Sequence, residues 1–197
     1  MKFLTREQVF DKMRENGHVI FENQSRKYNL NIIGIRSRTA KLDEFGCQLM
    51  VAYKYKDVWY DHSYRITTYP GRYYMIQKLL NPGGCAILVP GQYRGVYKVD
   101  YHRGLYKALC QRLGTVKCYR DGDRDEQFDL DKRTIIEGMF GINIHNSQDN
   151  MTTTRVGMHS AGCQVFSDDR EFNHFMSLLF ASLEQFPNIF TYTLINE

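Results

Sequence analysis

Apolar and polar residues alternate with the two-residue period of a β-strand through most of this chain. The clearest segments are 47–55 and 58–67, which only Lys56 and Asp57 separate. A two-residue gap between alternating segments predicts a β-hairpin. Further strands are predicted at 28–36, 85–89, 106–111, 115–120, 142–145 and 189–195. Strands at this spacing, with turn residues between them, are typical of an all-β sandwich or barrel.

Two segments carry the helical period instead. The first begins at a capping box formed by Thr5 and Gln8 and ends at Gly17. The second begins after Asp168, and apolar residues recur along one of its faces: Phe172, Phe175, Met176, Leu179, Phe180 and Leu183. We therefore predict a mainly β chain with peripheral helices. Residues 1–24 are expected to form an N-terminal helical appendage, and residues 25–197 a single domain.

Three shorter segments give less regular patterns. Residues 106–111 and 115–120 flank Leu113 and Gly114, which predicts a second hairpin. Residues 18–21 are apolar enough for a short strand. The glycine-containing segment 90–95 matches no phosphate-binding pattern, and we interpret it as a loop at the rim of a cleft.

Composition narrows the classes of function. The chain has 197 residues, of which 43% are hydrophobic and 24% charged, as in a folded globular protein. The net charge of +4 comes from scattered residues, which argues against a nucleic-acid surface. Five cysteines, odd in number and scattered, indicate reduced thiols. Neither an apolar leader nor a membrane-spanning stretch is visible, so we expect synthesis in the cytoplasm and no stable membrane insertion.

The segment 141–166 carries the candidate chemistry. His145 ends an alternating strand, and Cys163 stands eighteen residues further along, directly after Ser160-Ala161-Gly162. Glycine lets the backbone approach the sulfur closely, because it has no Cβ. A cysteine and a histidine that meet in space are the minimum for a thiolate nucleophile with its own base.

The same residues resemble a family signature. His145, the fourteen residues after it and Ser160-Ala161-Gly162-Cys163 resemble the L,D-transpeptidase (YkuD-type) pattern of a His, 14 to 17 residues and Ser/Thr-His-Gly-Cys. Ala161 replaces the second His of that pattern, and Val165 replaces its Arg or Asn. The Ala variant also resembles uncharacterised proteins of phages and Bacteroidetes. The resemblance implies an L,D-transpeptidase-like mixed β-sandwich that uses no cofactor.

The resemblance also implies roles for the catalytic residues. Cys163 is expected to be the nucleophile and His145 its base, and the backbone carbonyl of Asn146 is expected to orient the imidazole. The oxyanion hole is expected to consist of three backbone N–H groups, those of Ala161, Gly162 and Cys163.

Substrate contacts are expected from the residues around this motif. Ser160, His159 and Arg155 are the candidates, and Arg155 is expected to take the carboxylate that the residue at position 165 no longer holds. His159 shares a side with Ala161 and Cys163 if the segment is extended, so it is also expected to replace part of the missing family His. His102 either reaches a substrate carboxylate or lies in a surface turn.

The function expected from these roles is acyl transfer on peptidoglycan stem peptides through a thioester. The segment 146–159 is polar and offers few apolar residues for a dry lid, which favours hydrolysis over transfer. The expected protein is an L,D-carboxypeptidase or endopeptidase of a phage lytic type, acting on the cell wall. The alternatives are an L,D-transpeptidase proper and a non-catalytic binding or virion-structural module.

Metal binding is the competing interpretation of the same residues. His145, His159 and Cys163 could be three ligands of a catalytic zinc ion, although they lack the spacing of known zinc motifs. Residues 121–125 start like a calcium loop, but Glu126 and Lys132 stand where that loop has Gly and Glu. We therefore predict no metal.

Overall fold

The main sheet closes on itself as an eight-stranded barrel. The computed structural model describes residues 2–23, 25–147 and 150–197. Around the barrel the strands are β1 (Asn31–Arg36), β11 (Phe190–Asn196), β5 (Gly91–His102), β6 (Tyr106–Gln111), β9 (Ile144–Asn146), β10 (Gln164–Phe166), β3 (Val58–Thr67) and β2 (Cys47–Tyr55). The pairs β1–β11 and β9–β10 are parallel, and the other neighbouring pairs are antiparallel.

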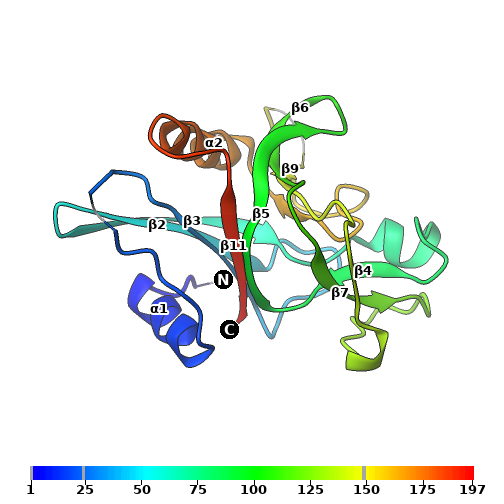
Figure 1. Ribbon diagram of the computed structural model, residues 1–197. Helices are drawn as coiled ribbons and strands as arrows, with labels where there is room; N and C mark the ends of the chain where they lie inside the picture. The colour runs from blue at the N-terminus through cyan, green and yellow to red at the C-terminus, as the bar shows by residue number, and fades with distance from the viewer. Residues whose placement is uncertain (1, 24, 148–149) are drawn as a thin grey trace.

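A second, smaller sheet lies at one end of the barrel (Figure 1). Its strands are β4 (Cys85–Leu88), β7 (Val116–Asp121) and β8 (Ile136–Gly138), all antiparallel. The chain therefore differs from a simple sandwich of two stacked sheets, because β2 pairs back with β1 and closes the larger sheet. The prediction of a mainly β chain with peripheral helices is confirmed.

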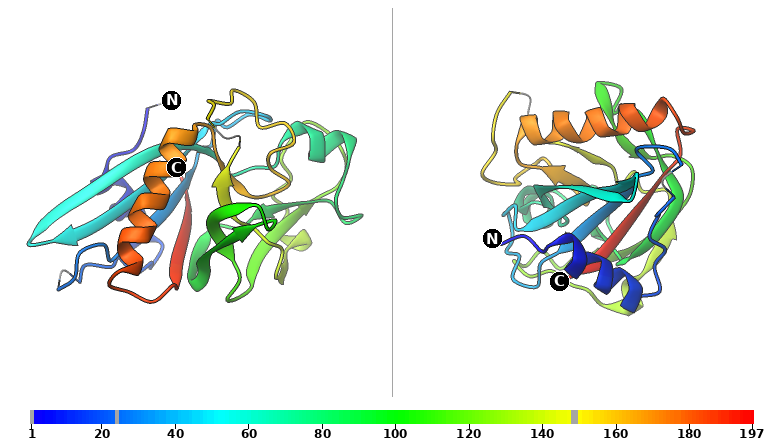
Figure 2. Two further views of the ribbon diagram at one scale, coloured as in Figure 1. Left: turned by 90° about the horizontal axis from the view of Figure 1, so that it is seen from above. Right: turned by 90° about the vertical axis from the view of Figure 1, so that its left-hand side faces the viewer.

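The two α-helices lie on different sides of the barrel (Figure 2). Helix α1 (Arg6–Glu15) packs Val9, Phe10 and Met13 against an apolar cluster on β1 and β2. Helix α2 (Asp169–Leu183) follows β10 and buries its apolar face in the main core. A short π-helical turn (Tyr73–Gln77) and a 3-10 turn (Lys132–Thr134) complete the helices of the described residues. None of the described helices combines the length and the apolar character that crossing a membrane requires.

Local sequence signals account for several of these elements. The capping box of Thr5 and Gln8 is present at the start of α1. Lys56 and Asp57 both have positive φ, 49° and 61°, as the tight turn between β2 and β3 requires. Asp168 caps α2 as predicted, with its carboxylate accepting from the N–H groups of Arg170 and Glu171. Phe180 is the exception on that helix, because it points outward and is exposed.

Three predictions about elements are wrong. Strands β6 and β7 do not form a hairpin, because β6 pairs with β5 and β9 while β7 pairs with β4 and β8. Residues 18–21 form no strand, since side-chain amides bond their backbone: Gln92 takes both Val19 N–H and Val19 C=O, and Asn31 does the same for Phe21. Segment 90–95 is no loop at a cleft, because β5 begins at Gly91.

A line of buried polar contacts crosses the barrel towards the candidate site. Gly34 on β1 faces Tyr192 on β11, and any Cβ at position 34 would collide with the tyrosine hydroxyl. That hydroxyl donates to Gln164 Oε1 over 3.1 Å. Gln164 Nε2 in turn donates to the carbonyl of Gly162 over 3.3 Å. The barrel interior therefore holds the turn that precedes β10 in place.

Candidate active site

His145 and Cys163 come from two neighbouring parallel strands. In the ladder His145 lies opposite Val165, and Gln164 N–H donates to Asn143 C=O over 2.9 Å. Gln164 points into the barrel, where it meets Tyr192. Because side chains alternate along a strand, His145 and Cys163 lie on the same outer side of the β9–β10 pair. Both line one cavity of about 470 Å³.

Backbone and side-chain contacts fix the orientation of the His145 ring. Its Nδ1 lies 2.6 Å from the carbonyl oxygen of Asn146, the group that was expected to orient it. Tyr106 Oη lies 3.2 Å from the same nitrogen and donates to the same carbonyl over 3.1 Å. The carbonyl accepts the ring proton, so Nδ1 is protonated and Nε2 carries the lone pair.

His145 is neutral and presents its lone pair to the cavity. Burial, followed by the neighbouring His102, lowers the pKa of His145 to about 3. Its Nε2 has no hydrogen-bond partner among the described residues, and it is not one of the fully buried atoms. A neutral imidazole with an open lone pair is able to accept a proton.

A second imidazole, that of His102, stacks on His145. The ring centroids are 4.0 Å apart and the planes differ by 23°. Gln111 N–H donates to Asn143 Oδ1 over 3.0 Å, which leaves Asn143 Nδ2 to donate to His102 Nδ1, also over 3.0 Å. The single proton of neutral His102 therefore lies on Nε2. Burial lowers the pKa of this histidine to about 4.

His102 does not lie in a surface turn, which was one of the two interpretations of its sequence. It is the last residue of β5, it is buried, and it lines the same cavity as His145. Its position forty-three residues before His145 gives no local signal of the contact. The sequence itself offers one hint, the polar neighbours Tyr101 and Arg103 that flank His102.

Cys163 is the one cysteine that is not buried. Its Sγ donates to the carbonyl of Gly141 over 3.4 Å. Burial around the sulfur raises the pKa of the Cys163 thiol, and the N–H of Asn143 and the charge of Arg103 act in the opposite direction. The resting group is a thiol rather than a thiolate.

The turn before Cys163 is held by the Ser160 hydroxyl. Ser160 is fully buried; its Oγ donates to Cys163 C=O over 2.8 Å and accepts from Gly162 N–H over 3.1 Å. The expectation that Ser160 binds substrate is therefore wrong, because both contacts of its hydroxyl lie within the turn. Gly162 has φ +134°, and a Cβ there would collide with Ala86 C=O.

The same contacts change the expected oxyanion hole. The Gly162 N–H is already bonded to Ser160 Oγ and is not available. The N–H groups of Ala161 and Cys163 donate no hydrogen bond within the described part of the chain. These two remain as candidate donors.

The other predicted substrate residues divide into two groups. His159 and Ala161 line the cavity beside Cys163, although residues 157–162 form turns and bends and not the extended segment that the alternation argument assumed. Arg155 is exposed and does not line the cavity, so its predicted role is wrong. Val165 is fully buried against Phe45 and Val156, which explains why an apolar residue stands there.

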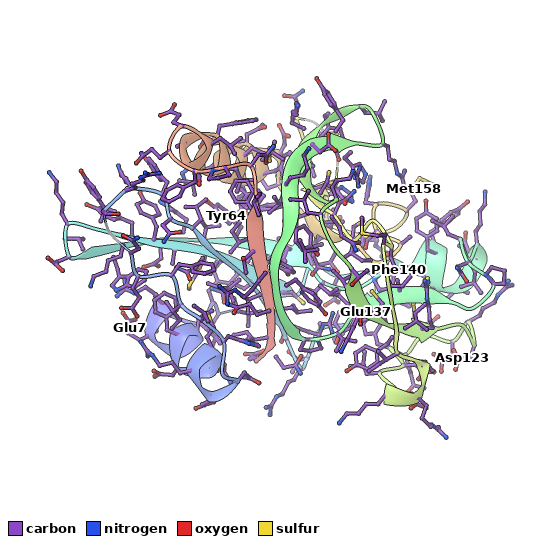
Figure 3. All side chains as sticks on the ribbon, viewed as in Figure 1. Glu7, Tyr64, Asp123, Glu137, Phe140 and Met158 are labelled. Atoms are coloured by element: carbon purple, nitrogen blue, oxygen red, sulfur yellow. The ribbon has the colours of Figure 1, made fainter. Side chains whose placement is uncertain are left out.

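Three arginines line the cavity instead, and the sequence singled out none of them except Arg103, as a neighbour of His102. Arg103 follows β5, Arg112 follows β6, and Arg120 belongs to β7. Phe140, beside Arg120, lies where the second sheet meets the barrel (Figure 3).

The three residues that were considered as zinc ligands are not placed together as a metal site would require. Among the described residues, one group of three ligand atoms lies within 4.8 Å of one another, that of Asp121, Asp123 and Asp129. His145, His159 and Cys163 do not form such a group. Asp121 is a structural residue, since its carboxylate accepts from Asp129 N–H over 2.9 Å.

Comparison of the chain with models of known protein families, with curated proteins and with solved structures finds no match. A proposal of function therefore rests on the chemistry of the site and on the resemblance of its motif.

Proposed function

We propose that this protein is a cysteine-dependent acyl-transfer enzyme that hydrolyses peptidoglycan stem peptides through a thioester. The observation that carries the proposal is the contact of His145 Nδ1 with the Asn146 carbonyl, in a cavity that Cys163 also lines. This contact leaves the Nε2 lone pair unused, in the cavity that the half-buried Cys163 thiol also lines. The resemblance of the motif to L,D-transpeptidases supplies the substrate class and the L,D-transpeptidase-like fold.

The first half of the reaction forms the thioester. His145 Nε2 accepts the thiol proton as Cys163 Sγ bonds to the carbonyl carbon of the scissile amide, whose oxygen becomes an oxyanion. The N–H groups of Ala161 and Cys163 donate to that oxygen. When the intermediate collapses, the C–N bond breaks and the leaving amine takes the proton from His145.

The second half returns the free thiol. A water molecule gives a proton to His145 Nε2 as its oxygen attacks the thioester carbon. The C–S bond then breaks, the sulfur takes the proton back from His145, and the acyl group leaves as a carboxylic acid. An amine in place of water would give transfer instead of hydrolysis.

Exposure of the loop before Cys163 supports hydrolysis as the outcome. Met151, Thr154 and Met158 are exposed, and Val156 turns away from the cavity into a separate apolar cluster. The described part of this loop therefore offers no apolar cover that would keep water from a thioester.

Incubation with a stem tetrapeptide and an excess of a D-amino acid tests this proposal. We expect the shortened acid as the main product, no product from Cys163→Ala, and no effect of a chelator. Mostly exchanged peptide would replace hydrolysis by transfer. Turnover by Cys163→Ala, or inhibition by the chelator, would refute the cysteine mechanism, and an inactive wild-type protein would leave the non-catalytic alternative.

A further inference from the structure

The cavity around Cys163 carries an unbalanced positive charge. Three arginines line it, and its described lining contains no aspartate or glutamate. The two buried histidines are neutral, so they add no charge. A cavity lined by one sign of charge concentrates ligands of the opposite sign.

Within the part of the chain that the structure describes, one of the three arginines is neutralised by a carboxylate. Arg112 Nε lies 3.2 Å from Asp100 Oδ2, and its other nitrogens donate to the carbonyls of Gln111 and Tyr101. These contacts hold the side chain in place and use three of its five N–H groups.

Arg103 and Arg120 keep their charge available. Within the described residues neither guanidinium forms a salt bridge. Arg120 is fixed by one bond from Nη1 to Gly84 C=O, 3.0 Å, and by the ring of Phe140, 4.8 Å from its Cζ. Arg103 stands in the turn between β5 and β6, next to His102.

The charge of Arg103 also reaches the reacting groups. It lowers the pKa of His102, of His145 and of the Cys163 thiol. Arg103 lines the same cavity as these three groups, which agrees with its effect on all of them.

We infer that Arg103 and Arg120 form a carboxylate subsite, so that the acyl donor is an anionic peptide with a free carboxylate close to the scissile bond. This inference rests on the proposed function for the reaction, although the anion site itself does not. Arginine binds carboxylates through paired N–H groups, which suits both the charge and the planar shape of such a ligand. Because Val165 is apolar and buried, binding of the carboxylate falls to residues outside the motif.

Alkylation of Cys163 by two reagents of similar size tests the subsite without any substrate. Iodoacetate carries a carboxylate, and iodoacetamide carries a neutral amide. The same thiolate attacks the CH2 carbon of either reagent and displaces iodide, so the ratio of the two rate constants cancels any change in the pKa of the thiol. Reaction of the full-length chain is followed by mass spectrometry, and Cys163→Ala identifies the reacting cysteine.

We expect the iodoacetate-to-iodoacetamide ratio at Cys163 to exceed that of a free cysteine peptide by about three- to tenfold. Arg103→Gln and Arg120→Gln should each lower the ratio, and high salt should do the same. Arg155→Gln is the matched control, because this exposed arginine is close to Cys163 in the sequence but lies outside the cavity. It should leave the ratio unchanged.

The outcomes separate this inference from the proposed function. A wild-type ratio equal to that of the free peptide would overturn the subsite. The same ratio in Arg103→Gln, Arg120→Gln and Arg155→Gln would also overturn it. Both conclusions would hold even if stem peptides are hydrolysed. A raised ratio that falls in Arg103→Gln and Arg120→Gln supports the subsite even if no peptide is hydrolysed. In active protein, amidation of the donor carboxylate should raise KM in the wild type and have less effect in Arg103→Gln.

Discussion

At the level of single residues, burial acts on the nucleophile and its base in opposite directions. It raises the pKa of the Cys163 thiol and lowers the pKa of His145 to about 3. Near neutral pH both groups are uncharged. The account therefore requires proton transfer during attack, and it excludes a thiolate that already exists in the resting protein.

The pH dependence of Cys163 alkylation tests this resting state. Because the pKa of this thiol lies above its usual value of 9.0, thiolate should form only in the alkaline range. The iodoacetamide rate should rise with pH and reach no plateau below about pH 9. A plateau already at neutral pH would show a stabilised thiolate and contradict the proposed order of proton transfer.

His102 offers a second test at this scale. Its ring stacks on His145, so we treat it as a positioning residue. His102→Gln keeps an acceptor for Asn143 but loses the stacked ring, worth about 1 kcal/mol. We expect kcat to fall about fivefold, the equivalent of that energy, with little change in KM.

His62→Gln is the control for this substitution, because His62 lies on β3 outside the cavity. It should leave both constants unchanged. A rise in KM with unchanged kcat in His102→Gln would instead indicate that His102 holds the substrate and does not position His145.

The residues of the site differ in how far the sequence reveals them. His145 and Cys163 lie in one segment, so the residues themselves point to them, and the resemblance of that segment to a family signature adds Asn146. His102 and Arg120 reach the cavity from β5 and β7, and only the pairing of distant strands places them there. Ser160 was misjudged because its residue type does not tell a buried turn contact from a substrate contact.

At the level of elements, the turn at 160–162 positions the nucleophile, and Gly162→Ala tests it. Its φ of +134° and the collision of a Cβ with Ala86 C=O both oppose any side chain. We expect a loss of more than about 2 kcal/mol in the free energy of unfolding, or a displaced turn with altered Cys163 alkylation.

Gly17→Ala is the matched control, because Gly17 also has positive φ, 68°, but nothing lies within 4 Å of its position. Only the backbone penalty of about 1 kcal/mol should appear there. Urea unfolding measures both variants. Equal effects at the two positions would mean that close packing at Gly162 is unimportant.

Local signals predicted elements better than they predicted pairing. The hairpin of β2 and β3 and the start of α1 depend on residues adjacent in the chain. The partners of β6 and β7 depend on long-range contacts: both Arg112 N–H and Leu113 N–H bond to Val96 C=O, which separates the two strands. No short-range pattern encodes that choice.

At the level of the whole molecule, the two buried histidines link stability to pH. Their pKa values fall from 6.5 to about 4 for His102 and about 3 for His145 on folding. Below pH 6.5 the unfolded chain binds protons that the folded chain does not. Stability contributed by their neutral forms is therefore complete above pH 6.5 and is lost as pH falls towards 4 and 3.

Urea unfolding at pH 7.5 and pH 5 measures this linkage. Each histidine should lower the free energy of unfolding of the wild type by up to about 2 kcal/mol between pH 6.5 and pH 5. A variant with both His102→Gln and His145→Gln should lose correspondingly less over the same interval. Parallel losses in the two proteins would show that these rings are not the source of acid sensitivity.

The central claim is that Cys163 carries the acyl group during turnover. The direct measurement is the mass of the intact protein after acid quenching of a reaction with a stem tetrapeptide, followed by peptide mapping. We predict an increase equal to the acyl fragment on the peptide that contains Cys163, and no increase in Cys163→Ala. Cleavage of the tetrapeptide without any adduct on Cys163, or cleavage by Cys163→Ala at the wild-type rate, would contradict the account.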